Sequence, residues 1–219
     1  MSSDPTQFVR DNTAPASPSL VPEITLHLAT EVTPLWHATE ATLATSQLPP
    51  PYWAFAWPGG QAIARHILDN PSLVAGKSVL DFGAGSGLVA IAAKRAGASC
   101  VIAAEIDSFS IAAMQLNAAL NHVAIETECN DIIGDDRRWD IVLIGDMCYE
   151  RPLADRLVPW LKALATCGAT VLLGDPGRAY LPKTGLRKIA EYAVPTSLDL
   201  EDRTVRETVI WQLGNTIAI

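Results

Sequence analysis

Three glycines at alternate positions, Gly83, Gly85 and Gly87, follow Asp81 at the end of a short apolar run. Glycine adopts backbone angles that other residues resist, and it lets a ligand approach the main chain closely. A helix-like sequence begins at Leu88, and the free N–H groups at a helix start face whatever lies beside the turn. The pattern indicates a loop that binds a nucleotide-type cofactor.

The spacing of the glycines separates the candidate cofactors. A dinucleotide-binding loop follows the pattern G-x-G-x-x-G, which Gly83 and Gly85 begin and Leu88 breaks. The phosphate-binding string G-x-x-x-x-G-K-[ST] does not occur in the chain. An NAD-dependent dehydrogenase is therefore disfavoured.

An acidic residue, Glu105, ends the next predicted strand, over residues 99–104, and lies 24 positions after Asp81. A carboxylate at this place can accept hydrogen bonds from both hydroxyls of a ribose. The alternative for Glu105 is a solvated strand end. Asp107 is predicted to cap a helix over 108–121 instead.

The string Asp-x-Gly-x-Gly-x-Gly after a strand resembles motif I of the class I S-adenosylmethionine (AdoMet) methyltransferases. The resemblance implies AdoMet as the cofactor and assigns its ribose to Glu105. It also implies that the cofactor is bound by Asp81, Gly83, Ala84, Gly85 and Gly87.

Aromatic side chains are concentrated in residues 52–57, which hold two Trp, one Tyr and one Phe in a chain only 6% aromatic. Flanking prolines and glycines predict a loop ahead of a helix over 60–70, and such loops often carry function. Aromatic rings stack on adenine and attract a sulfonium cation. Trp57 is therefore predicted to bind the cofactor and Trp53 to contact substrate. The alternative is a hydrophobic plug between helix and sheet.

Asp146 and Tyr149 lie three positions apart, after a predicted strand over 139–144. Open α/β sheets bind ligands at the carboxyl ends of their strands. The two side chains are predicted to converge on one amine as the catalytic pair, with Asp146 also touching the cofactor. The alternatives are a cap for the following helix and a packing role for the tyrosine.

Two more acidic residues follow predicted strands. Asp131, after the strand over 124–129, is predicted to accept a hydrogen bond from the adenine amino group, or else to belong to a turn. Asp175, after the strand over 169–174, is predicted to orient substrate, or else to stabilise the Pro-Gly turn that follows it.

Strands and helices alternate regularly along most of the chain, which predicts a doubly wound α/β fold with helices on both faces of a mostly parallel sheet. The predicted strands cover 78–82, 99–104, 124–129, 139–144, 169–174, 193–199 and 205–213. The predicted helices in this part cover 87–96, 108–121, 152–166 and 184–192. The last two strands are too close for a crossover helix, so they are predicted to form an antiparallel hairpin. Seven strands with this ending resemble the class I methyltransferase sheet.

The chain is predicted to divide into an N-terminal extension over 1–47 and a methyltransferase domain over 48–219. Four prolines among Ser, Thr and Asn predict that residues 1–22 are mobile. A strand over 23–28 and a short helix over 36–43 are also predicted.

Composition excludes several classes of function. The net charge of −8 argues against a nucleic-acid partner. No apolar run approaches the ~20 residues of a membrane span, and no signal or transit peptide is evident, so a cytoplasmic, bacterial-type location is expected. The four cysteines show no C-x-x-C, and the four histidines show no metal-ligand spacing, so no metal site is predicted.

Four strings together resemble the seven-strand protein-lysine methyltransferases of family 16, in particular those acting on the beta subunit of electron-transfer flavoprotein. They are P-P-Y-W-A-x-x-W-P-G-G-Q, D-F-G-A-G-S-G, G-D-M-C-Y and G-D-P-G-R, and the likeness spans about residues 48–213. The family's Asp-x-x-Tyr element maps onto Asp146 and Tyr149, and its tryptophan before motif I maps onto Trp57. The resemblance implies transfer of methyl groups to lysine amines of that beta subunit.

Three alternatives remain open at this point. A ribosomal protein L11-type methyltransferase shares the cofactor core but usually carries a separate N-terminal domain, for which ~45 residues are too few. A catalytically silent AdoMet-binding scaffold is opposed by the intact glycine loop, Glu105, Asp146 and Tyr149. Other protein methyltransferases share the same core. The sequence indicates no oligomeric state.

Overall fold

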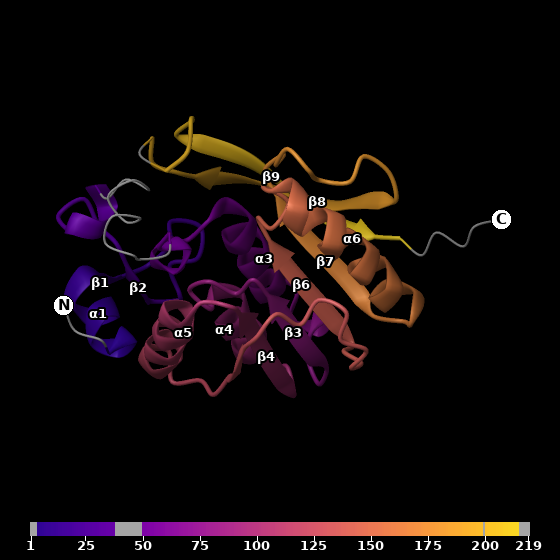
Figure 1. Ribbon diagram of the computed structural model, residues 1–219, viewed down its shortest axis with the longest axis horizontal. Coiled ribbons are helices and arrows are strands. Elements are labelled where there is room, and N and C mark those ends of the chain that lie inside the picture. Colours follow the sequence, from indigo (N-terminus) through magenta and orange to yellow (C-terminus); the bar gives the residue numbers. More distant parts are fainter. Residues whose placement is uncertain (1–3, 38–49, 199, 215–219) are drawn as a thin grey trace.

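The computed structural model describes residues 4–37, 50–198 and 200–214. Its centre is a seven-stranded sheet in the order β5-β4-β3-β6-β7-β9-β8 (Figure 1). The five strands from β5 to β7 are parallel, and β9 runs antiparallel to both of its neighbours, β7 and β8. The strands are β3 (Ser78–Phe82), β4 (Cys100–Glu105), β5 (Glu126–Cys129), β6 (Ile141–Gly145), β7 (Thr170–Asp175), β8 (Leu186–Pro195) and β9 (Val205–Leu213). The predicted α/β sheet with a C-terminal antiparallel hairpin is confirmed.

Helices cover both faces of this sheet. The helices are α3 (Pro58–Asp69), α4 (Leu88–Arg95), α5 (Ser108–Leu120) and α6 (Arg151–Thr166). Alternate residues of a strand point to opposite faces: Ile141 and Leu143 of β6 pack with α3, α4 and α5, whereas Val142 and Ile144 pack with α6. The parallel strands are therefore buried on both sides, which explains their continuous apolar runs.

The N-terminal segment packs on the domain. Helix α1 (Pro5–Asn12) is capped by Asp4, whose side chain accepts a hydrogen bond from the Thr6 backbone N–H, and its buried Val9 joins a cluster with α5. Strand β1 (Ala14–Ala16) pairs with β2 (Leu26–Leu28). The composition of residues 1–22 predicted a mobile segment, but from Asp4 onward the structure shows regular elements held by buried side chains. The division at residue 47 stays a prediction.

Three short 3-10 helices complete the described elements: η1 (Pro34–His37), η2 (Tyr52–Ala54) and η3 (Pro71–Leu73). Helix η1 overlaps the helix predicted over 36–43 only at Trp36 and His37, and the rest of that prediction falls outside the described residues. The strand predicted over 23–28 is reduced to β2. Among the described residues, no helix has the length and apolar character that crossing a membrane requires.

The helix predicted over 184–192 is wrong, because these residues form most of strand β8. Strand β8 is the edge strand of the sheet, and most of its side chains are only half-buried or exposed. A register shift between Lys188 and Ala190 also breaks the alternation that would have marked a strand. Pairing with β9 outweighs the helix propensity of Leu, Arg, Lys and Ala in this segment. The strand predicted over 193–199 ends earlier, at Pro195.

Candidate active site

A pocket of about 460 Å³ opens where the carboxyl ends of β3, β4, β5 and β6 meet. Parallel strands bring their following loops to one edge of the sheet, so residues far apart in the sequence converge there. The pocket is lined by most of the predicted site residues, namely Trp57, Gly83, Gly85, Glu105, Asp131, Asp146 and Tyr149.

The glycine loop forms one wall of this pocket through Gly83 and Gly85. Both residues, and Gly87, have positive φ angles of 67°, 51° and 78°, a region that side chains disfavour. A Cβ atom on Gly83 would lie 2.3 Å from the sulfur of Met147, so the loop also packs tightly against the segment after β6. Gly87 faces Met114 of α5, and neither it nor Ala84 lines the pocket.

Asp81 lies behind the pocket, in the middle of the sheet. Its carboxylate is 2% exposed and accepts a hydrogen bond from the backbone N–H of Ala90, in the first turn of α4. Gly87 at the start of α4 has no side chain that caps the helix, so Asp81 supplies the acceptor from β3. Asp81 therefore holds the glycine loop against α4 and does not line the pocket itself.

The burial of Asp81 gives a prediction for stability. Desolvation raises the pKa of this carboxyl to about 7. Because the unfolded chain releases the proton at lower pH than the folded protein, the free energy of unfolding falls as pH rises from about 4 to 7. We expect Asp81→Asn, which keeps the acceptor but does not titrate, to remove this loss, which is about 4 kcal/mol for a pKa raised from its ordinary value to about 7. Urea unfolding at several pH values measures it, and equal pH slopes for both proteins would contradict it.

Glu105 ends β4 and faces the pocket from beside the glycine loop. One carboxylate oxygen accepts a hydrogen bond from the Gly85 backbone N–H at 3.1 Å, and the other accepts from the Ile106 N–H at 3.0 Å. Burial is the main cause that raises the pKa of Glu105 above its ordinary value. The carboxylate is thus fixed in direction, with acceptor capacity left for a ligand. Asp107 caps α5 by accepting from the Phe109 N–H, as predicted.

The two tryptophans of the aromatic loop have different places. Trp57 lines the pocket, donates its indole N–H to the Tyr52 carbonyl oxygen at 2.9 Å, and packs edge to face against the rings of Tyr52 and Phe55. Trp53 is only 1% exposed and packs in the core beside Phe8 of α1. The substrate contact predicted for Trp53 is therefore wrong, and the packing alternative holds for this residue.

Asp146 follows β6 with a φ of 58°, the left-handed region that non-glycine residues rarely adopt. Its carboxylate is buried, and one oxygen accepts a hydrogen bond from the Gly59 backbone N–H at 2.5 Å. The other oxygen accepts two hydrogen bonds from the Arg178 guanidinium, at 2.7 and 3.0 Å. Asp146 does not cap the helix that follows it, whose N-cap is Glu150; it holds the start of α3 instead.

Burial shifts the ionisation of both members of the predicted catalytic pair. It raises the pKa of Asp146 to about 6, against the lowering effect of Arg178. It raises the pKa of Tyr149 to about 12, so the phenol is neutral at ordinary pH. The Tyr149 ring is partly exposed at the pocket and packs edge to face on Tyr52. The pair offers one carboxylate and one neutral hydroxyl to a ligand.

Asp175 lies at the end of β7 and does not line the pocket. Its buried carboxylate accepts hydrogen bonds from the backbone N–H groups of Gly177 and Arg178, at 2.7 and 2.6 Å. This is the turn-stabilising alternative, and the substrate contact predicted for Asp175 is wrong. The turn places Arg178 at the pocket, although the sequence pattern predicts no role for this residue.

Asp131 lies at the opposite end of the pocket from this turn, in the loop after β5. It forms an ion pair with Arg156 of α6 at 2.5 Å and accepts a hydrogen bond from the Ile133 backbone N–H. Its carboxylate is thus partly engaged, and its predicted adenine contact stays a prediction. Within the described ranges, no group of three or more His, Cys, Asp or Glu side chains is arranged to hold a metal ion.

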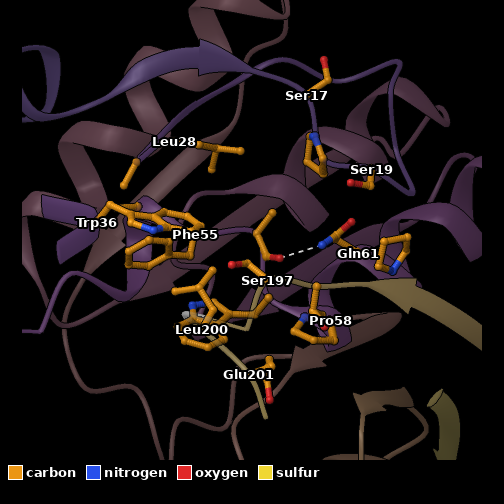
Figure 2. A pocket seen from close by; sticks show the side chains of 17 residues that line it. Ser17, Ser19, Leu28, Trp36, Phe55, Pro58, Gln61, Ser197, Leu200 and Glu201 are labelled. Carbon is orange, nitrogen blue, oxygen red and sulfur yellow. Dashed lines mark hydrogen bonds between the residues drawn. The ribbon is translucent and has the colours of Figure 1, made fainter. Parts of the chain in front are cut away.

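A second pocket of about 300 Å³ lies between the N-terminal segment, the aromatic loop and the turn between β8 and β9 (Figure 2). Trp57 and Pro58 line it, and Trp57 also lines the first pocket. Gln61 closes one side, where its amide donates to the Ala56 carbonyl oxygen at 2.7 Å. Glu201 lies at the edge opposite Ser17 and Ser19. Trp57 therefore separates two cavities.

Known proteins with similar sequences and structures agree with this geometry. The family model "Ribosomal protein L11 methyltransferase (PrmA)" matches residues 65–145, from α3 to the end of β6. The structure of magnesium protoporphyrin IX methyltransferase from Synechocystis PCC 6803, which has SAM bound, superimposes with a TM-score of 0.52 at 18% identity, covering 70% of this chain and 77% of that one. The likeness shows the class I methyltransferase fold.

Two relatives extend over almost the whole chain. The electron transfer flavoprotein beta subunit lysine methyltransferase of Danio rerio is 40% identical over 213 residues, which cover 94% of this chain and 81% of the relative. The protein of the same name from Homo sapiens is 40% identical over 212 residues, which cover 93% and 80%. On this identity and coverage, the chain belongs to the electron transfer flavoprotein beta subunit lysine methyltransferase family.

Proposed function

We propose that this protein transfers methyl groups from AdoMet to lysine side chains of the beta subunit of electron transfer flavoprotein. The observation that carries the proposal is the pocket itself. The glycine loop and Glu105 form one part of it, and Asp146 and Tyr149 form another. The family relatives, whose names state this substrate, match over the length that holds all of these residues.

The residues present fit AdoMet. Gly83 and Gly85 leave the backbone beside the pocket uncovered, and the fixed Glu105 carboxylate suits a pair of ribose hydroxyls. Trp57 and Tyr149 supply aromatic surface, which attracts a sulfonium cation. Asp131 is the predicted acceptor for the adenine amino group. When bound, AdoMet supplies an activated methyl group that needs no further electrophilic assistance.

The task left to the protein is to place a neutral lysine amine in line with that methyl group, and positioning of this kind accounts for a large part of catalysis. Asp146 lies at the pocket, where its carboxylate can accept from the incoming amine and offset the positive charge of the methylated product. The partly exposed Tyr149 ring forms a wall beside it. A nearby cation and desolvation both favour loss of the amine's proton to water before transfer.

The test of the proposal is methyl transfer from labelled AdoMet to the purified beta subunit, followed by identification of the modified residues. Ribosomal protein L11 is the comparison substrate, because the L11 family model matches residues 65–145. We expect label on lysines of the flavoprotein subunit and not on L11. Label on L11 alone would replace the proposed substrate.

Glu105 gives a prediction about the cofactor. We expect Glu105→Gln to weaken AdoMet binding by about 10- to 100-fold, since a carboxylate acceptor is lost from the ribose. Because burial raises the pKa of Glu105, wild-type affinity should fall as pH drops through that raised value, and the variant should lack this dependence. Calorimetry at several pH values measures both effects. The exposed Glu126→Gln is the control, and equal affinity in all three proteins would remove Glu105 from the site.

We propose a cytoplasmic location, as expected from the sequence. The four cysteines are free thiols, as in a reducing compartment. Fractionation of cells that express the native chain tests this directly.

A further inference from the structure

The Asp146 carboxylate is the first member of a chain of alternating charges that runs from the pocket to the turn between β8 and β9. Arg178 donates to Asp146 from Nε and Nη2, and its Nη2 also donates to Glu201 at 2.6 Å. The other oxygen of Glu201 accepts from Arg206 at 3.0 Å, and Arg206 also pairs with Asp202 at 3.3 Å. The chain therefore connects the candidate catalytic carboxylate to the C-terminal hairpin.

The inner part of this chain is shielded from water. The Glu201 side chain is 4% exposed and that of Arg178 is 17% exposed, whereas the outermost Asp202 side chain is 67% exposed. Charges interact more strongly where water is excluded. The Arg178 guanidinium also lies 5.9 Å from the centre of the Trp57 ring, so it contacts two walls of the first pocket. Its position is thus set by two carboxylates and an aromatic ring.

This arrangement keeps a negative charge at Asp146 although a guanidinium is bound to it. Alone, Arg178 would neutralise Asp146 and remove the negative charge that a methylated amine requires. Glu201 binds the same guanidinium, and Arg206 and Asp202 continue the alternation, so the five groups together carry a net charge of −1 when the three carboxyls are ionised. Asp146 lines the first pocket, whereas Glu201 lies in the turn between β8 and β9 and lines the second pocket.

We propose that Arg178 and Glu201 are positioning residues of the methyl-transfer site: Arg178 fixes the Asp146 carboxylate, and Glu201 offsets the Arg178 charge so that Asp146 stays available to the target amine. The proposal rests on the proposed function, because it assigns Asp146 to the lysine amine. It adds two residues that act on the reaction through Asp146.

Other charged or titratable groups of the described residues also lie near Asp146. Asp175 acts on it from the turn after β7, Cys148 lies on its own segment, and Glu105 faces the same pocket from β4. The backbone N–H of Gly59 comes from the start of α3. Burial has the largest effect on the Asp146 carboxyl, and Arg178 is the cation that opposes it, so a change in the charge of Arg178 or of its partner Glu201 should shift the ionisation of Asp146.

The experiment measures the ionisation of Asp146 and methyl transfer in parallel. The variants are Arg178→Gln, Arg178→Lys and Glu201→Gln, with Asp202→Asn as the matched control, since Asp202 neighbours Glu201 and shares its partner Arg206 but does not touch Arg178. Carbon-13 NMR of labelled aspartates gives the Asp146 titration, assigned by its loss in Asp146→Asn. The pH profile of kcat/KM gives the same quantity in turnover.

The two charge removals should shift the Asp146 titration in opposite directions, each by roughly half to one pH unit. Loss of the Arg178 charge raises the pKa of Asp146, and loss of Glu201 lowers it because Arg178 then acts on Asp146 alone. Arg178→Lys should remain near wild type in the titration and regain part of the activity. Glu201→Gln should lose about 10-fold in kcat/KM, with AdoMet affinity unchanged within about 2-fold. Asp202→Asn should match wild type throughout.

If the pKa of Asp146 does not change in the variants, or if it shifts in the same direction in both, the proposal is overturned. The row of charged residues would then only stabilise the hairpin between β8 and β9. If Glu201→Gln does not fold, Glu201→Asp keeps the charge and shortens the reach, and a wild-type pH profile with wild-type kcat/KM would likewise contradict the assignment. The NMR titration needs no substrate. A wild-type enzyme that fails to methylate the flavoprotein subunit but shows the opposite shifts would therefore refute the proposed substrate and retain the electrostatic coupling.

Discussion

Replacement of Asp146 by Asn should lower kcat/KM for lysine methylation by at least about 100-fold. The side chain keeps its shape, but the charge that receives the amine is lost from a buried site at the end of β6. AdoMet affinity should change far less, by about 3-fold or under, because the residues proposed to bind the adenosine, Glu105 and the glycine loop, line other parts of the pocket. Steady-state kinetics and calorimetry on the same preparation separate the two effects.

The control for this variant is Asp155→Asn, which removes a charge from an exposed position of α6. Asp146 also accepts hydrogen bonds from the Gly59 N–H and from Arg178, so the Asn variant will be less stable than the wild type. The kinetics should therefore be measured at a temperature at which circular dichroism shows that both proteins are folded. Wild-type turnover by the folded Asp146→Asn protein would show that the carboxylate only supports the start of α3. Tyr149→Phe should be milder, since the ring remains.

Much of the site could be predicted because it follows from strand order. Each parallel strand of the sheet ends at the same edge, so a polar residue directly after an apolar run is placed at the pocket without knowledge of side-chain packing. Glu105 after β4 and Asp146 after β6 are found by this rule. The same rule wrongly predicted that Asp81 and Asp175 line the pocket. Asp81 lies within β3 and its carboxylate accepts a hydrogen bond from α4, and the Asp175 carboxylate accepts one from the turn that follows it.

Arg178 and Trp53 show which features of the site the sequence pattern cannot predict. Arg178 reaches Asp146 from a position 32 residues along the chain, and only the pairing of β6 with β7 and the turn held by Asp175 bring them together. Trp53 and Trp57 lie in one aromatic string, and their composition gives no sign of which ring enters the core. The packing of α1 decides this, since Phe8 covers Trp53.

The helix predicted over 184–192 was wrong for a different reason. A helix and an edge strand differ mainly in what lies beside them, and strand β9 beside this segment comes later in the chain. Edge strands with half-exposed side chains lack the clear apolar alternation of buried strands. The hairpin itself was predictable, because the short connection excludes a crossover helix.

Replacement of Gly59 by Ala should destabilise the protein by at least about 4 kcal/mol and abolish methyl transfer with it. A Cβ atom on Gly59 would lie 2.2 Å from the Gly174 carbonyl oxygen, 2.5 Å from an Asp146 carboxylate oxygen and 2.8 Å from the Asp146 nitrogen. Two of these three atoms are backbone atoms, so a side-chain rotation cannot relieve the contact. The start of α3 has to move away, and the hydrogen bond from Gly59 to Asp146 is then lost.

The neighbouring Gly60→Ala is the matched control for this prediction. Its Cβ would meet nothing closer than a methyl group of Val89 at 3.9 Å, an ordinary contact, and alanine is favoured over glycine in a helix by about 0.5–1 kcal/mol. Gly60→Ala should therefore be as stable as wild type or more so, and active. Thermal and urea unfolding of the two variants measure the difference. Equal stability of both would mean that α3 does not pack against Gly174 of β7 and against Asp146, which follows β6, and the carboxylate would then lack the support that places it in the pocket.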